Sequence, residues 1–261
     1  MPDGATPRDA WNALKEERGI TPEKAYNDLR EKDEKREDKS GKDEALTEEQ
    51  KKYIDAFKKD MSNYAVKVIE PKPRSGIPTD EEIINTIAGG DLTKGSCVSV
   101  GLAYIANKNG MFVTDFRGGR SQRLFSHGWA NLSKIFNDKK ATEYNGFEST
   151  EKVLAEMEKD KEYALVTGRH FSIVKRTDNG FKYLELQSPT DNGYKPLTKQ
   201  ALRDRFGVKI RRTLYHMPVK QNAYLIGLDK FSDNQSTLRD LVGYLNTDGK
   251  NEKKEINGSV K

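Results

Sequence analysis

The sequence predicts an α+β fold, because helical patterns come first along the chain and a group of strands follows them. Strand patterns occupy residues 162–168, 170–176 and 181–187. The last two are separated by Thr-Asp-Asn-Gly at residues 177–180, a sequence typical of a tight β-hairpin turn. A buried helix is predicted before them, over residues 97–107, from an apolar run that is closed by Asn-Gly. We therefore expect a helix packed on an antiparallel sheet.

Composition divides the chain into three parts. Only 34% of the 261 residues are hydrophobic and 33% are charged, so the whole length cannot form a core. Residues 1–64 place few apolar residues among many charges, and we expect a charged helical arm or linker there. The α+β domain is expected over residues 65–246. Residues 247–261 are expected to form a flexible tail.

Helix-capping patterns mark two of the predicted helices. Thr47 and Gln50 match a capping box near the end of the arm, and the helix they open has a thin apolar stripe of Tyr53, Ile54, Phe57 and Met61. Thr79 and Glu82 repeat the capping pattern and open a helix over residues 80–88. We further expect strands over residues 111–116 and 223–229, and helices over residues 127–136, 149–160, 198–207 and 236–246.

The charge of the chain does not indicate a nucleic-acid partner. Its 46 basic and 41 acidic residues leave a net charge of +5, whereas phosphate binding requires clustered cations. A single Arg-Gly-Gly at residues 117–119 is a weak signal, and the basic segment 209–216 is interpreted as a solvated face. The sequence contains neither a secretory signal nor an apolar run of transmembrane length, so no membrane partner is expected.

Cys97, the single cysteine, excludes an intrachain disulfide and leaves three interpretations: a small buried hydrophobe, a metal ligand or a nucleophile. A metal site is not expected, because His127, His170 and His216 are too widely spaced to act as ligands with it. No cofactor is expected either.

The position of Cys97 favours a nucleophile. Gly95 and Ser96 precede it, as in a tight turn that leads into a helix. At a helix N-terminus the backbone N–H groups and the helix dipole stabilise a thiolate and can bind an oxyanion. The pKa of this thiol is therefore expected to lie below the ordinary value of about 8.5.

A nucleophilic thiol requires a base, and the base requires an orienting acceptor. His170 begins one strand of the predicted hairpin. Glu185 and Gln187 lie two residues apart on the returning strand, and their side chains therefore point to one face of the sheet. We expect Cys97 and His170 to meet in one cleft, with Glu185 or Gln187 behind the imidazole.

These segments resemble a known family. Residues 97–116 (CVSVGLAYIANKNGMFVTDF) and 170–187 (HFSIVKRTDNGFKYLELQ) are similar to the papain-fold toxin domains of bacterial polymorphic toxins. Related domains occur in bacteriophage head-morphogenesis proteins, which residues 113–126 and 241–261 resemble. The similarity covers residues 77–230. It implies a papain-like fold in which Cys97 is the nucleophile, His170 is the general base, and Glu185 and Gln187 stand at the positions of the family's Asp and Gln.

The sequence departs from the family pattern at two positions. The acceptor is Glu185 where the family has Asp, and the Glu side chain is one methylene longer. Papain-like proteases place a Gln six residues before the Cys to help bind the oxyanion, and here that residue is Asp91. The backbone N–H of Cys97 and a side chain such as Thr93 or Ser96 would then have to bind the oxyanion.

The resemblance implies peptide-bond hydrolysis or glutamine deamidation of a protein substrate or host protein, in the cytoplasm of a bacterial host. Two other functions remain open. One is a phage head or ejected protein, carried in the virion, that keeps the fold with little activity and contacts phage head proteins through its N-terminal arm. The other is a nucleic-acid-binding module.

Overall fold

The computed structural model describes residues 46–74, 76, 78–87, 97–113, 124–126, 132–136, 139–188 and 191–245. The chain divides into two compact units, Met1–Asp43 and Glu44–Lys261, and every described residue belongs to the second. Most of the predicted arm, residues 1–45, and the whole of the predicted tail, residues 247–261, lie outside the described residues.

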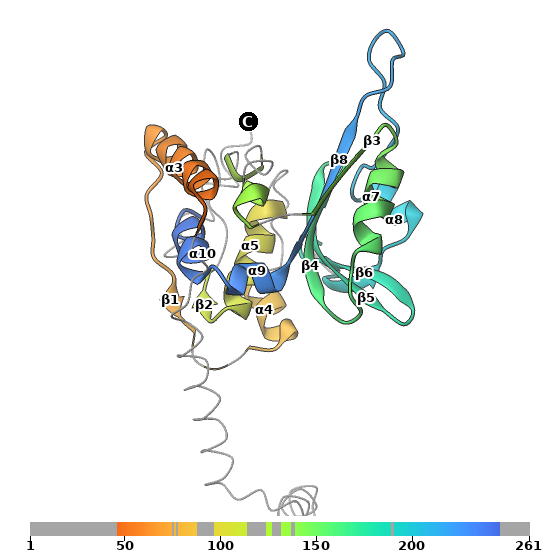
Figure 1. Cartoon of the computed structure of the whole chain (residues 1–261). Coiled ribbons are helices and arrows are strands. Elements are labelled where there is room, and N and C mark those ends of the chain that lie inside the picture. Colours follow the sequence, from red (N-terminus) through yellow and green to blue (C-terminus); the bar gives the residue numbers. More distant parts are fainter. Residues whose placement is uncertain are drawn as a thin grey trace, which may run out of the picture. The chain divides into compact units, whose positions relative to one another are not determined.

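The centre of the second unit is a six-stranded antiparallel sheet in the order β3-β8-β4-β5-β6-β7 (Figure 1). Its strands are β3 (Lys139–Glu143), β4 (Glu162–Thr167), β5 (His170–Thr177), β6 (Gly180–Glu185), β7 (Gly193–Pro196) and β8 (Gln221–Gly227). The predicted hairpin is present, because Thr177 pairs with Gly180 across the turn between β5 and β6. A second, two-stranded sheet joins β1 (Lys72–Pro73) to β2 (Met111–Phe112).

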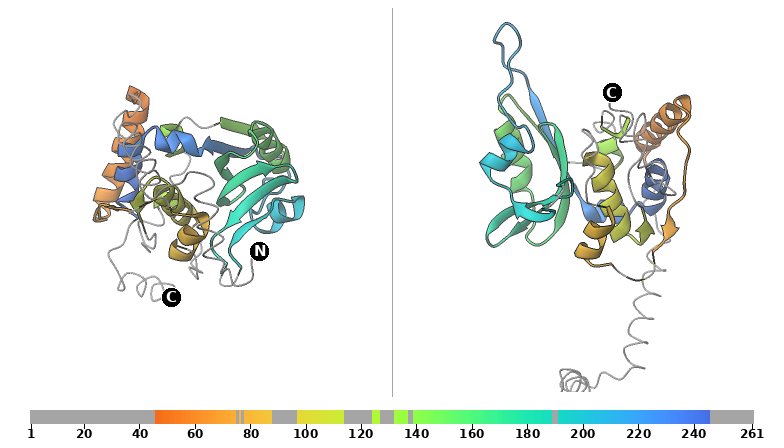
Figure 2. Two further views of the ribbon diagram at one scale, coloured as in Figure 1. Left: turned by 90° about the horizontal axis from the view of Figure 1, so that it is seen from below. Right: turned by 180° about the vertical axis from the view of Figure 1, so that it is seen from behind.

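Helices lie on both faces of the larger sheet, and the α+β expectation is confirmed. They are α3 (Glu48–Asn63), α4 (Asp80–Ile87), α5 (Cys97–Lys108), α7 (Gly146–Ala155), α8 (Lys199–Asp204), α9 (Leu228–Ser232) and α10 (Gln235–Val242). Figures 1 and 2 show α7 and α8 on one face of the sheet and α5 on the other.

The alternation of side chains along each strand supplies two separate cores. On β5, Phe171 and Ile173 belong to the core that contains α5, whereas Val174 belongs to the core that contains Phe206 and residues of α7. The two faces therefore present different groups to their helices, which matters for the placement of His170.

Helix α5 lies close against β5 because Gly101 leaves room for an aromatic ring. A Cβ atom added at Gly101 would stand 2.0 Å from Cε1 of Phe171. Tyr104 anchors the next turn of the helix, since its hydroxyl lies 3.0 Å from a carboxylate oxygen of Asp80 and 3.0 Å from one of Glu162. These contacts fix the N-terminus of α5, and with it Cys97, over the beginning of β5.

The predicted domain boundary differs from the structure. The sequence assigned residues 48–63 to the arm, but Ile54, Phe57 and Met61 of α3 are buried in the same core as α5. The amide of Gln50 also donates a hydrogen bond of 2.7 Å to the backbone carbonyl of Ile135. The thin apolar stripe is wide enough to pack, because the helix needs to cover only one edge of the core.

Four further elements were not predicted: the short strand β1, the edge strands β3 and β7, and the short helix α9. β3 has the sequence Lys-Lys-Ala-Thr-Glu, which carries no apolar alternation and forms a strand by pairing with β8. No helix in the described part of the chain is both long and apolar enough to cross a membrane.

Candidate functional site

Cys97 is the first residue of α5, as the sequence predicted. Its side chain is partly buried, and the thiol is free. The backbone N–H groups of Cys97, Val98 and Phe171 lie within hydrogen-bonding reach of the sulfur and favour its thiolate form. Two of these donors come from the helix N-terminus, and the third comes from β5, directly after His170.

The pKa of the Cys97 thiol is nevertheless raised, which is opposite to the expected direction. Burial of the sulfur disfavours the thiolate more than the three N–H groups and the positive charge of Arg205 favour it. The geometry of a helix N-terminus is therefore present, but the protonated thiol is the resting form at neutral pH.

His170 is the first residue of β5, and its side chain faces α8 rather than α5. Its ring packs edge-on against Phe206, with the ring centroids 4.9 Å apart and an interplanar angle of 83°. Only 7% of the residue is exposed. Burial, with a smaller effect from the charge of Arg205, lowers the pKa of His170 from 6.5 to about 3, so the imidazole is neutral.

Cys97 and His170 therefore meet at one end of β5 but approach it from opposite faces. The Cys97 sulfur lies near the backbone N–H of Phe171, whose ring faces α5. The side chain of His170, one residue earlier on the strand, points to the opposite face, toward Phe206. In the part of the chain that the structure describes, no hydrogen bond joins the thiol to the imidazole.

Glu185 and Gln187 are brought together by Arg205 instead of by His170. The Glu185 carboxylate accepts hydrogen bonds from Arg205 Nε at 2.6 Å and from Arg205 Nη2 at 2.7 Å. It also accepts one from the backbone N–H of Gln187 at 2.8 Å, and the Gln187 side-chain oxygen accepts a weaker one from Arg205 Nη2 at 3.3 Å. These hydrogen bonds give both oxygens of the Glu185 carboxylate a partner, although the residue is only 7% exposed.

Arg205 and Phe206, which follow α8, were not singled out in the sequence. Arg205 holds Glu185 and acts electrostatically on both Cys97 and His170, whereas Phe206 packs against the imidazole. A buried Glu185 requires a cation as its partner, and this requirement was the one feature of the sequence that pointed to an arginine or lysine beside it. The sequence alone offers many arginines and does not indicate which one lies beside it.

The remaining predicted site residues, Thr93 and Ser96, lie outside the described residues, as do Asp91 and His127. Within the described ranges, no group of three His, Cys, Asp or Glu side chains is arranged to hold a metal ion. Comparison of the chain with family models, with curated proteins and with solved structures gives no match.

Proposed function

We propose that this chain is a papain-like cysteine hydrolase that acts on a protein amide, as a peptidase or a glutamine deamidase of the phage or toxin type. One observation carries the proposal. Cys97 begins a helix that packs on an antiparallel sheet, and its sulfur faces the backbone N–H of the residue that follows His170. A helix-start thiol next to a strand histidine is the arrangement from which thiol acyl transfer can proceed.

The reaction would proceed in two stages. His170 takes the proton from Cys97 Sγ, and the sulfur attacks the carbonyl carbon of the substrate amide. The C–N bond breaks, the imidazolium returns the proton to the leaving nitrogen, and a thioester remains on Cys97. Water then attacks the thioester with His170 as the base, which releases a carboxylic acid and restores the thiol. The leaving group is an amine in peptide hydrolysis and ammonia in deamidation.

The first proton transfer sets a clear condition. A raised thiol pKa and a lowered imidazole pKa both keep the proton on sulfur. The imidazole must also come within about 3–4 Å of Sγ to accept it. The proposal therefore requires that the start of β5 rearranges when substrate binds, so that the His170 side chain leaves Phe206 and reaches Cys97.

A chemical-labelling experiment tests this function. Peptidyl and glutamine-like ketones that alkylate an attacking thiol are incubated with the full chain, and adducts are located by mass spectrometry. We expect an adduct on Cys97 that forms more slowly in His170→Gln, which removes the base but keeps a side chain of similar volume. Plain iodoacetamide serves as the accessibility control. It should label Cys97 slowly at neutral pH and faster in alkaline solution, because burial raises the pKa of the thiol.

A matched variant keeps the result specific to the base. His216→Asn changes an exposed histidine and should leave ketone labelling unchanged. Equal ketone labelling in native protein and His170→Gln, both folded by circular dichroism, contradicts the role of His170. Absence of any ketone adduct under conditions in which iodoacetamide reacts contradicts the hydrolase itself.

A second candidate function rests on the burial of the same two residues. A partly buried protonated thiol and a neutral imidazole packed on Phe206 also fit a phage head or ejected protein that keeps the fold with little activity. Cosedimentation of the chain with virions, together with no ketone adduct on Cys97, would favour this candidate.

A further inference from the structure

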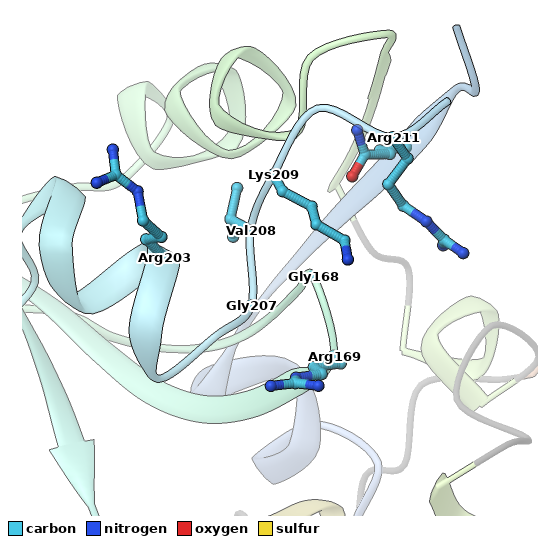
Figure 3. A pocket seen from close by; sticks show the side chains of 8 residues that line it. Gly168, Arg169, Arg203, Gly207, Val208, Lys209 and Arg211 are labelled. Carbon is cyan, nitrogen blue, oxygen red and sulfur yellow. The ribbon is translucent and has the colours of Figure 1, made fainter. Parts of the chain in front are cut away.

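A positively charged pocket lies between α8, the β4–β5 turn and the start of the segment that leads to β8. Its volume is about 410 Å³, and its lining includes Arg169, Arg203, Lys209 and Arg211. Figure 3 shows these four side chains around the pocket: Arg169 comes from the β4–β5 turn, Arg203 from α8, and the other two from the segment that leads to β8. Three separate parts of the chain therefore contribute positive charge to one concave site.

The positive charge of this pocket is not neutralised from within the described chain. Among the described residues that line it, none is an aspartate or a glutamate. None of its four cations forms an ion pair with a described carboxylate, whereas the neighbouring Arg205 is fully engaged by Glu185. Four like charges around one concavity repel each other, so an anion that enters it is attracted by all of them.

The backbone that forms the pocket is tightly constrained. Gly168 and Gly207 both have positive φ angles, of 59° and 68°. A Cβ at Gly168 would stand 2.3 Å from the carbonyl oxygen of Phe206, and one at Gly207 would stand 2.7 Å from Arg169 Nε. The N–H of Arg169 donates a hydrogen bond of 2.8 Å to the same Phe206 carbonyl. These close approaches hold the β4–β5 turn against the segment after α8, so the site is built in advance of any ligand.

The charge continues beyond the pocket along a hairpin arm, residues 209–220, which Figure 1 shows projecting past the end of β8. The N–H of Val219 donates to the carbonyl of Arg211 at 2.9 Å, which pairs the two sides of the arm. Arg212 and Lys220 add two more cations. A ligand with a single phosphate would need only the pocket, whereas this line of charge fits a polymer.

An exposed aromatic ring lies beside the pocket. Tyr144 is 51% exposed, and its carbonyl accepts a hydrogen bond of 3.3 Å from Gln221, which lines the pocket. Lys220 Nζ lies 5.6 Å from the centre of the Tyr144 ring. Exposed rings among cations are the surface on which the bases of single-stranded nucleic acid stack while phosphates bind the cations.

We propose that the pocket and the hairpin arm of residues 209–220 bind single-stranded nucleic acid. Its phosphates would bind Arg169, Arg203, Lys209 and Arg211, and a base would stack on Tyr144. Guanidinium groups suit phosphate because they donate paired hydrogen bonds in a fork. A recessed pocket favours a chain that can enter it over the flat surface of a lipid bilayer. The proposal does not depend on Cys97, so it stands or falls separately from the hydrolase.

Binding of a fluorescent single-stranded oligonucleotide to the full chain, followed by anisotropy over a range of salt concentrations, tests the proposal. Arg203→Gln/Arg211→Gln removes two phosphate contacts and should weaken binding about tenfold. It should also reduce the slope of log affinity against log salt by about 1.4, which is about 0.7 for each contact. The matched control Lys72→Gln/Arg239→Gln removes the same charge from exposed residues of β1 and α10 and should leave both quantities nearly unchanged.

Two further measurements separate this interface from simple attraction. Tyr144→Ala should weaken binding about tenfold, whereas Tyr144→Phe should retain it, because stacking requires the ring and not the hydroxyl. The proposal is overturned if both double variants lose affinity equally, because binding would then follow net charge alone. Binding to vesicles that contain phosphatidylserine, or to inorganic phosphate, without binding to the oligonucleotide also overturns it.

Discussion

At the scale of single residues, the imidazole of His170 is controlled by its surroundings more than by its place in the sequence. It lies edge-on to Phe206, with 7% of the residue exposed and the charge of Arg205 nearby. Its burial and, to a smaller extent, the charge of Arg205 disfavour the imidazolium form. The fold therefore keeps neutral the residue that the proposed reaction uses as a base. Because the unfolded chain does not do so, protonation of His170 is coupled to unfolding.

This property predicts an acid-sensitive contribution to stability. The pKa of His170 is about 3 in the folded chain, against 6.5 for the free side chain. Between these two values the unfolded chain binds more protons, so the free energy of unfolding falls as pH falls below 6.5. The advantage of native protein over His170→Gln should shrink by about 2 kcal/mol from pH 7 to pH 5.

Urea unfolding at several pH values measures this difference, with His216→Asn as a control for an exposed histidine in the left-handed conformation that asparagine tolerates. If native protein and His170→Gln show the same pH dependence, the imidazole is not buried in a neutral form.

At the scale of elements, the position of Cys97 depends on how closely α5 approaches β5. Gly101 is one turn after Cys97, and a Cβ there would stand 2.0 Å from the ring of Phe171. Phe171 is 2% exposed, so its ring is enclosed by the core. A glycine inside a helix normally costs about 1 kcal/mol relative to alanine, so its presence here is explained by packing.

Gly101→Ala should therefore destabilise the chain, although helix propensity alone predicts the reverse. We expect a loss of about 1–3 kcal/mol from overpacking, measured by chemical unfolding. Phe171→Leu shortens the opposing side chain, so the double variant Gly101→Ala/Phe171→Leu should be more stable than the sum of the single effects. Stabilisation by Gly101→Ala alone would show that α5 does not lie this close to β5.

At the scale of the whole molecule, α3 belongs to the folded unit even though its composition resembles that of a linker. Ile54, Phe57 and Met61 are buried beside Phe125 and the helices that cover β5. Lys58 also forms an ion pair with Asp240 of α10. The globular unit therefore begins before α3 and not after it.

Two fragments test this boundary. A fragment of residues 44–261 keeps α3 and should melt cooperatively at a temperature close to that of the full chain. A fragment of residues 65–261 loses three buried side chains, each worth roughly 1.5–3 kcal/mol, and should melt far lower or bind a hydrophobic dye. Calorimetry of the two fragments decides the matter. If both fragments melt at similar temperatures, α3 belongs to the N-terminal arm of residues 1–64 and not to the folded unit.

The sequence by itself determined the local elements of this protein. The start of α5 at Cys97, the hairpin turn at Thr177–Gly180 and the capping box of α3 were all predictable, because each depends on residues a few positions apart. The strands with apolar alternation were predicted for the same reason. β3 was not, because its stability comes from a partner strand about 80 residues away.

Tertiary structure alone decided what these elements do together. It packs His170 against Phe206 and pairs Glu185 with Arg205. It also raises the pKa of the Cys97 thiol through burial. It also gathered the cations of the pocket from three segments of a chain whose net charge is only +5. Burial, electrostatic fields and charge clustering depend on distances in space between residues far apart in sequence, and composition and local spacing carry no record of those distances.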